Sequence, residues 1–106
     1  MGRLLDGPNP PDAAFCFTDF LALGAYRAVT DRGLVPGRDA GIVGYDDHEV
    51  CRTVDIPLTS VKLHSFEIGR QAAELLFDRL FHPHIRRSPT VILTPELKVR
   101  HSSGRR

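Results

Sequence analysis

Two scarcities narrow what this chain of 106 residues can be. It has only two cysteines, Cys16 and Cys51, and their spacing fits neither a CxxC motif nor a disulfide framework. No apolar run is long enough to cross a bilayer, and residues 1–6 lack the apolar stretch of a secretory signal. We therefore expect reduced, packed thiols in a cytoplasmic protein.

The sequence also lacks a marked excess of positive charge. Fourteen Lys and Arg residues oppose thirteen Asp and Glu residues, which leaves a net charge of +1. A free-standing nucleic-acid binder usually carries a concentrated basic stripe. The nearest arginine pairs here, at 86–87 and 105–106, are short and lie beside Pro or Gly, which favours solvated charge. We therefore expect that this chain does not hold DNA by itself.

The composition that is present fits one soluble globular domain or a part of one. Hydrophobic residues make up 42% and charged residues 25% of the chain. This length suffices for one hydrophobic core but not for two. If the chain belongs to a two-lobed domain, the faces that lack their partners would be apolar and exposed, and self-association would follow.

Short apolar runs between turn-forming residues predict a βαβ unit in the first half. Residues 6–12 are dense in Gly, Pro, Asn and Asp and cannot continue a regular element. The apolar runs 13–17 and 40–44 suit parallel strands that are buried on both faces. Residues 46–55 are polar and predict an irregular segment. The order of strand, helix and strand predicts a right-handed crossover.

Between these two runs the pattern predicts an amphipathic helix from Thr18 to Arg32. Either Thr18 or Asp19 can accept hydrogen bonds from the free N–H groups at the start of this helix, and Gly33 suits its end. Its apolar positions are Leu21, Ala25, Ala28 and Val29. Periodicity alone does not separate a face that packs in the core from one that meets a second subunit.

The second half predicts a long helix between extended segments. Residues 56–61 are expected to be extended, because a residue before proline avoids helical geometry. Ser65 is a plausible N-cap for an amphipathic helix that Pro83 ends. Residues 90–94 and 96–100 predict two last strands, separated by a proline.

Four sequence blocks then occur in one order. They are Phe15-Cys16-Phe17-Thr18-Asp19-Phe20-Leu21-Ala22-Leu23-Gly24-Ala25, Ile42-Val43-Gly44-Tyr45-Asp46-Asp47, Pro57-Leu58-Thr59-Ser60-Val61 and Pro95-Glu96-Leu97-Lys98-Val99-Arg100. Together they resemble the C-terminal part of the effector domain of lactose-repressor/galactose-repressor (LacI/GalR) transcription regulators, over nearly the whole chain from Pro11 to Arg100. Each block is weak alone, but four in series are specific.

The resemblance implies an α/β fold: a three-layer βαβ fragment of a periplasmic-binding-protein-like (type I) domain. In that fold three strands cross between two lobes, and a small effector lies in the cleft between the lobes. On this basis residues 1–12 are a disordered or linker lead-in, and 13–61 are the βαβ portion of the C-terminal lobe. Residues 62–100 are the crossover, long helix and strands that would pack on a missing N-terminal lobe, and 101–106 are a tail.

Polar residues after the two predicted strands indicate where an effector binds. In open α/β sheets, ligands bind beyond the carboxyl ends of parallel strands, and an ionised carboxylate accepts several hydrogen bonds from sugar or nucleoside hydroxyls. The resemblance makes Asp46 the principal ligand, with Thr18 in place of the family's usual Asn. Asp19 is a further candidate, although it can instead serve the helix start. Leu63 stands where some members have Gln, and Ser65 where one has an aromatic residue.

The expected function is the effector-binding and dimerisation portion of a sugar- or nucleoside-responsive bacterial transcription regulator. It would catalyse nothing and need no cofactor, metal or membrane. Effector binding would shift the population between two lobe arrangements and so change the spacing of the DNA-reading heads of a homodimer. DNA would be held only by a helix-turn-helix that this chain lacks. Segments 18–32 and 48–53 are the candidates for subunit contact.

Other functions stay open at this point. A stand-alone sugar-binding module or an inactive gene fragment would keep the same fold. A phosphoacceptor domain could use Asp46 and Asp47 to hold Mg²⁺, although it needs a five-fold alternation of strand and helix, and Asp47 more readily serves a turn. A hydrolase could combine Asp46, His48 and a serine, but no nucleophile motif is present. The His-Pro-His segment at 82–84 lacks a third metal ligand nearby.

Overall fold

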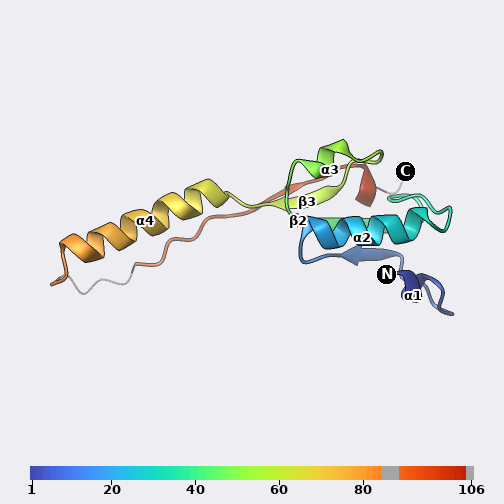
Figure 1. Ribbon diagram of the computed structural model, residues 1–106, viewed down its shortest axis with the longest axis horizontal. Coiled ribbons are helices and arrows are strands. Elements are labelled where there is room, and N and C mark those ends of the chain that lie inside the picture. The colour runs from blue at the N-terminus through green and yellow to red at the C-terminus, as the bar shows by residue number, and fades with distance from the viewer. Residues whose placement is uncertain (85–88, 105–106) are drawn as a thin grey trace. The chain divides into compact units, whose positions relative to one another are not determined.

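A computed structural model describes residues 1–84 and 89–104 and shows two compact units (Figure 1). The first unit comprises Met1–Lys62 and Glu96–Arg106, and the second comprises Leu63–Pro95. A four-stranded sheet organises the first unit, and one long helix dominates the second. The α/β class that the sequence predicts is confirmed.

The sheet of the first unit has the strand order β1-β2-β3-β4. The strands span Ala13–Phe15 (β1), Gly41–Asp46 (β2), Thr59–Lys62 (β3) and Glu96–Lys98 (β4). The first three run parallel, with Phe15 beside Val43 and Val43 beside Thr59, whereas β4 is antiparallel to β3. Both strands of the predicted βαβ unit are therefore present with shifted ends. The carboxyl ends of β1, β2 and β3 meet at one edge of the sheet.

Helices of the first unit precede, connect and follow these strands. They are α1 (Gly2–Leu5), α2 (Asp19–Thr30), α3 (Val50–Thr53) and the 3₁₀ turn η1 (His101–Ser103). Of the two N-caps that the sequence allowed for α2, Thr18 and Asp19, the structure shows Thr18, whose hydroxyl oxygen accepts the N–H of Leu21 at 3.3 Å. Along the chain, α2 connects β1 to β2. Figure 1 shows this helix lying along the sheet. The turn α3 forms inside the segment that the sequence predicted to be irregular.

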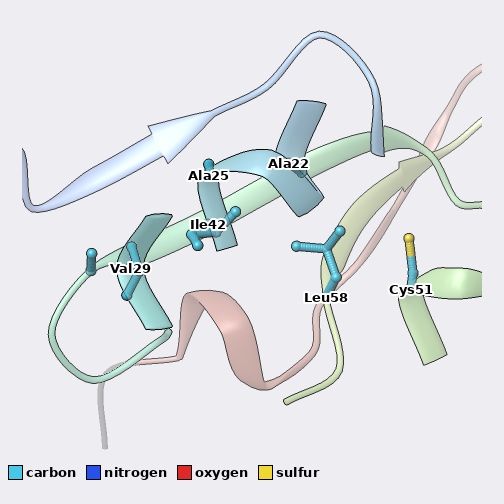
Figure 2. Packing of buried hydrophobic residues seen from close by; sticks show 7 residues of the cluster. Ala22, Ala25, Val29, Ile42, Cys51 and Leu58 are labelled. Carbon is cyan, nitrogen blue, oxygen red and sulfur yellow. The ribbon is translucent and has the colours of Figure 1, made fainter. Parts of the chain in front are cut away.

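The hydrophobic core lies between α2 and the sheet (Figure 2). Its buried members are Ala22, Ala25, Val29, Ala40, Ile42, Cys51 and Leu58. Fully burying a side chain the size of Ile42 or Leu58 contributes about 1.5–3 kcal/mol, so this cluster holds the helix on the sheet. Leu21, an apolar position of the predicted helix, is 60% exposed, whereas Ala22 beside it is fully buried.

The end of the described chain belongs to the fold, although the sequence predicts a tail at 101–106. Ser102 is fully buried in η1. Its hydroxyl donates to the carbonyl oxygen of Ile42 at 2.6 Å and accepts the N–H of Thr59 at 2.8 Å. Its own N–H donates to the carbonyl oxygen of Pro57 at 3.0 Å. This polar residue can be buried because its hydroxyl and its N–H both have hydrogen-bond partners. The sequence does not show that these partners would be within reach.

Residues 1–12, predicted as a disordered or linker lead-in, contain the helical turn α1. Met1 and Leu5 pack against the hydrophobic core. The Arg32 guanidinium donates to both carboxylate oxygens of Asp6, at 2.5 and 2.7 Å. A single helical turn is unstable by itself, so these contacts with Arg32 and the core explain why it forms.

The second unit is built on α4, which spans Ser65–Phe81. The N-cap is His64, so Ser65, the predicted cap, is the first helical residue instead. The helix ends before Pro83, as predicted. None of its residues is buried among the described parts of the chain. The apolar face of this amphipathic helix is therefore largely exposed. Such a helix is stabilised mainly when its apolar face packs against a partner.

Residues 90–94 form no strand in the described structure, which contradicts the strand predicted there. The side chains of 91–93 instead line a cavity with Ile68, Ala72 and Leu75 of α4. A strand needs a neighbouring strand to pair its N–H and C=O groups, and the described part of the second unit presents a helix. Residues 96–98, grouped by the sequence with the second unit, pair with β3 in the first.

Gly37→Ala should destabilise the first unit. Gly37 has a φ of +83°, and a Cβ there would overlap the carbonyl oxygen of His101. We expect the free energy of unfolding to fall by at least about 2 kcal/mol in urea titrations followed by circular dichroism. Gly24→Ala is the matched control, because open space surrounds Gly24 within α2 and alanine should stabilise the helix by about 0.5–1 kcal/mol. Wild-type stability of Gly37→Ala would contradict the close approach to η1.

Candidate functional site

The candidate site lies at the carboxyl edge of the parallel strands. Thr18 follows β1, and Asp46 is the last residue of β2. Because β1 and β2 pair in parallel, with Ala14 beside Ile42, both residues emerge at the same edge. The structure therefore brings to one edge of the sheet the two polar segments at which the sequence predicted an effector site. The binding role of these residues stays a prediction.

Asp46 combines partial burial with an unusual backbone. Its φ is 106°, and that of Asp47 is 56°, a region that residues other than glycine rarely adopt. Such a conformation costs on the order of 1–3 kcal/mol and collects at functional sites. Within residues 1–84 and 89–104, the Asp46 carboxylate makes no hydrogen bond or ion pair with another side chain or backbone group. It is therefore available to a ligand.

Asp47 contrasts with its neighbour. Its side chain is fully buried and forms ion pairs with Arg100 at 2.6 Å and with Arg52 at 2.9 Å. Its N–H donates to the hydroxyl oxygen of Ser60 at 3.1 Å. Asp47 thus holds the loop to the protein, which agrees with the turn role that the sequence favoured.

Asp19 is also fully buried, although the sequence placed it among the candidate effector ligands. Its carboxylate accepts the Ser60 hydroxyl at 2.5 Å and the His48 N–H at 2.7 Å, and lies 3.2 Å from His48 Nδ1. Burial alone would raise the pKa of Asp19, but hydrogen bonds from Ser60, His48 and Cys51 outweigh it and lower that pKa. The carboxylate is therefore charged and directed into the protein.

The remaining predicted residues differ in their placement. The Thr18 hydroxyl oxygen accepts the Leu21 N–H as the cap of α2, which leaves the hydroxyl proton free to donate to a ligand. Leu63 and Ser65 belong to the second unit, where Leu63 directly follows β3 in the chain and Ser65 begins α4. Their part in effector binding stays a prediction.

Sequence reasoning missed Ser60 and Arg100 as members of this site. Ser60 is fully buried in β3, and Arg100 donates to the carbonyl oxygen of Leu58 at 2.7 Å besides pairing with Asp47. The sequence supports only a general expectation, that a buried carboxylate needs hydrogen-bond donors or cations nearby. The sequence does not show which of its arginines and serines supplies them.

The structure also places the residues that a hydrolase or a metal site would use. The buried Ser60 donates to Asp19 and not to His48, so these three residues are not arranged as a nucleophile and its base. Cys51 also faces the Asp19 carboxylate, and burial together with that hydrogen bond raises the pKa of its thiol to about 12. His82 lies 3.1 Å from Asp78 on α4. In the described ranges, no group of three or more possible metal ligands comes together.

Comparisons with known proteins agree on the family. The model of the periplasmic binding protein-like domain matches residues 2–103. The HTH-type transcriptional repressor PurR of Haemophilus influenzae is 38% identical over 104 residues, which cover 96% of this chain and 31% of the repressor. The chain therefore spans about a third of the length of the curated relatives it matches.

Solved structures support the same family. A LacI family transcriptional regulator from Enterococcus faecium with bound ribose superposes with a TM-score of 0.83 at 30% identity, over 96% of this chain and 37% of that one. The lac repressor dimer bound to operator and the anti-inducer ONPF gives 0.85 at 30% identity, over 97% and 31%. This chain belongs to the periplasmic binding protein-like family, in the branch of the LacI-type regulators. Among the described residues, no helix has the length and hydropathy of a membrane span.

Asp19→Asn should lower stability in a pH-dependent way. The lowered pKa in the folded state means that the charged carboxylate stabilises the fold above its unfolded pKa, and that this stabilisation is lost as the pH falls through the folded pKa. Wild type should therefore exceed the variant by about 1.5–3 kcal/mol at neutral pH, and the difference should shrink below about pH 4.

Urea titrations over a series of pH values measure this difference. Asp31→Asn is the control, because Asp31 is exposed and pairs only loosely with Arg27, at 3.7 Å. A pH-independent difference between wild type and Asp19→Asn would contradict the ionised state of the buried carboxylate.

Proposed function

We propose that this chain is the effector-binding and dimerisation portion of a bacterial transcription regulator, and that Asp46 is the principal ligand of a small hydroxyl-rich effector. One observation carries the proposal: the Asp46 carboxylate, which has no partner among the described residues, stands in a strained backbone at the carboxyl edge of a parallel sheet. Ligands of open α/β sheets bind at this edge. The repressors among the relatives support the regulatory role, a non-enzymatic function and a cytoplasmic location.

A sugar or nucleoside is the effector class that suits this carboxylate. An ionised carboxylate accepts short, charge-assisted hydrogen bonds from two neighbouring hydroxyls. Thr18, at the same edge, adds a hydroxyl that can donate to a ring or hydroxyl oxygen. The ribose in the Enterococcus faecium regulator supports this class, since that structure is similar over 96% of this chain.

The regulatory mechanism that fits is a shift between two arrangements of a dimer. An effector changes an equilibrium only by binding one state better than the other. Such a change would alter the spacing of DNA-binding domains that belong to the complete regulator. The lac repressor structure, a dimer bound to its operator, supports a dimeric arrangement.

The subunit contact is assigned to segments 18–32 and 48–53. Phe20 and Leu21 on α2 are 66% and 60% exposed, and the ring of Phe20 lies 5.1 Å from that of His48, which joins the two segments into one surface. Exposed aromatic side chains are frequent anchors of protein interfaces. This surface is therefore the proposed dimer contact.

Asp46→Gly should separate binding from stability. Glycine adopts a positive φ without strain, so the free energy of unfolding should rise by about 1 kcal/mol. Loss of the carboxylate should weaken effector binding by about tenfold to a hundredfold, the value of a charged hydrogen bond. Calorimetric titration of the complete protein with ribose, cellobiose and ribonucleosides measures the affinity. Asp31→Gly is the exposed control, and unchanged affinity of Asp46→Gly would refute the assignment.

Phe20→Ser should weaken dimerisation at least about tenfold, because an aromatic anchor at an interface contributes about 2 kcal/mol or more. Sedimentation of the complete protein over a concentration series gives the dissociation constant of the dimer. Leu4→Ser is the control, since Leu4 is 61% exposed on α1 and lies outside both contact segments. Equal effects of the two substitutions would contradict the assigned contact.

A further inference from the structure

We propose that Asp19 is a positioning residue, which fixes the loop after β2 so that the Asp46 carboxylate is held in the geometry an effector meets. This inference rests on the proposed role of Asp46. It also replaces the direct ligand role that the sequence suggested for Asp19, since a fully buried carboxylate acts on the protein around it.

The backbone at Asp46 and Asp47 needs restraint from outside. Their φ values of 106° and 56° place Cβ close to backbone oxygen atoms, which residues other than glycine avoid. A backbone in this region persists only where surrounding contacts over-determine it. The hydrogen-bond partners of the N–H groups of Asp47 and His48 must supply that restraint.

Two backbone contacts supply the restraint, and both lead to Asp19. The N–H of His48 donates directly to Asp19 Oδ2 at 2.7 Å. The N–H of Asp47 donates to Ser60 Oγ at 3.1 Å, and the Ser60 hydroxyl donates to Asp19 Oδ1 at 2.5 Å. One carboxylate therefore orients two successive peptide groups, directly and through a serine.

The Asp19 carboxylate is itself held rigidly. It lies in the first turn of α2, a helix anchored by the buried Ala22 and Val29. On its other side the backbone of β2 comes so close that a Cβ on Gly44 would overlap Asp19 Oδ1. The closely packed Asp19 carboxylate thus connects the loop to a helix that is anchored in the hydrophobic core.

The arginines complete the arrangement by separating the two neighbouring acids. Arg100 and Arg52 hold the Asp47 carboxylate at 2.6 and 2.9 Å. Asp47 is thereby kept inside the protein, while no described side chain pairs with the carboxylate of Asp46. The loop therefore presents one acid to a ligand and uses the other as an anchor.

Asp19→Asn in ¹⁵N-labelled protein tests this positioning role. Asparagine keeps the shape but removes the charge, so the amide signals of Asp47 and His48 should shift, and the affinity for ribose or the tightest-binding ribonucleoside should fall about tenfold or more. Val29→Ala is the matched control, because it weakens the core of the same helix without touching the loop. It should leave the loop signals and the affinity unchanged once both variants are measured well below their unfolding transitions.

Ser60→Ala keeps the proposal testable if Asp19→Asn does not fold. It removes the acceptor of the Asp47 N–H and spares that of His48, so it should shift the Asp47 signal and weaken probe binding. Wild-type loop signals, or wild-type affinity despite shifted signals, in the folded variant would overturn the proposal alone. Unchanged affinity in Asp46→Gly would instead overturn the effector role of Asp46 itself, and the two failures are thereby distinguished.

Discussion

The first unit depends on one buried carboxylate and its donors. Asp19 joins the start of α2 to β3 through Ser60 and to the loop after β2 through His48. Burying an ionised group is costly unless hydrogen bonds replace its water, and here hydrogen bonds outweigh burial and lower the pKa of the carboxyl. The three segments come from distant parts of the chain, so a single group fixes how helix, strand and loop meet at the candidate site.

That constraint lets two adjacent residues of the same type perform different tasks. Asp47 is enclosed by arginines, whereas Asp46 keeps an unpaired carboxylate among the described residues. The strain in their backbone is offset by the surrounding hydrogen bonds and ion pairs, as is common where a site is preorganised. In the proposed function, an effector would then meet a carboxylate whose direction is already set, which lowers the entropic cost of binding.

Apolar surface is left exposed in both units. Phe15 and Leu97 of the sheet are 66% and 55% exposed, and no residue of α4 is buried among the described parts of the chain. Exposed apolar faces of this kind are unusual in a free-standing soluble domain and mark surfaces that bind partners. In the proposed function, such faces would be covered by the other parts of a two-lobed effector domain.

The fold was predictable where local signals suffice. The apolar runs of β1 and β2, the Thr18 cap of α2, and the proline that ends α4 are all readable from short stretches of sequence, and the four blocks of the resemblance identified the family. The strand prediction failed where the structure depends on whether a neighbouring strand is present. Residues 90–94 have strand-forming side chains but form no described strand, because strand formation requires a pairing edge.

The sequence by itself determined the α/β class, the family and the pair of acidic residues at the edge of the sheet. Only the tertiary structure decided that Asp19 and Ser102 are buried, that Arg100 pairs with Asp47, and that Asp46, unlike Asp47, has no partner among the described residues. The physical reason is distance along the chain: Asp19 and Ser60 are 41 residues apart, and Ser102 and Ile42 are 60 apart. Which donor meets which acceptor across such separations depends on how the strands pair, and no local pattern records it.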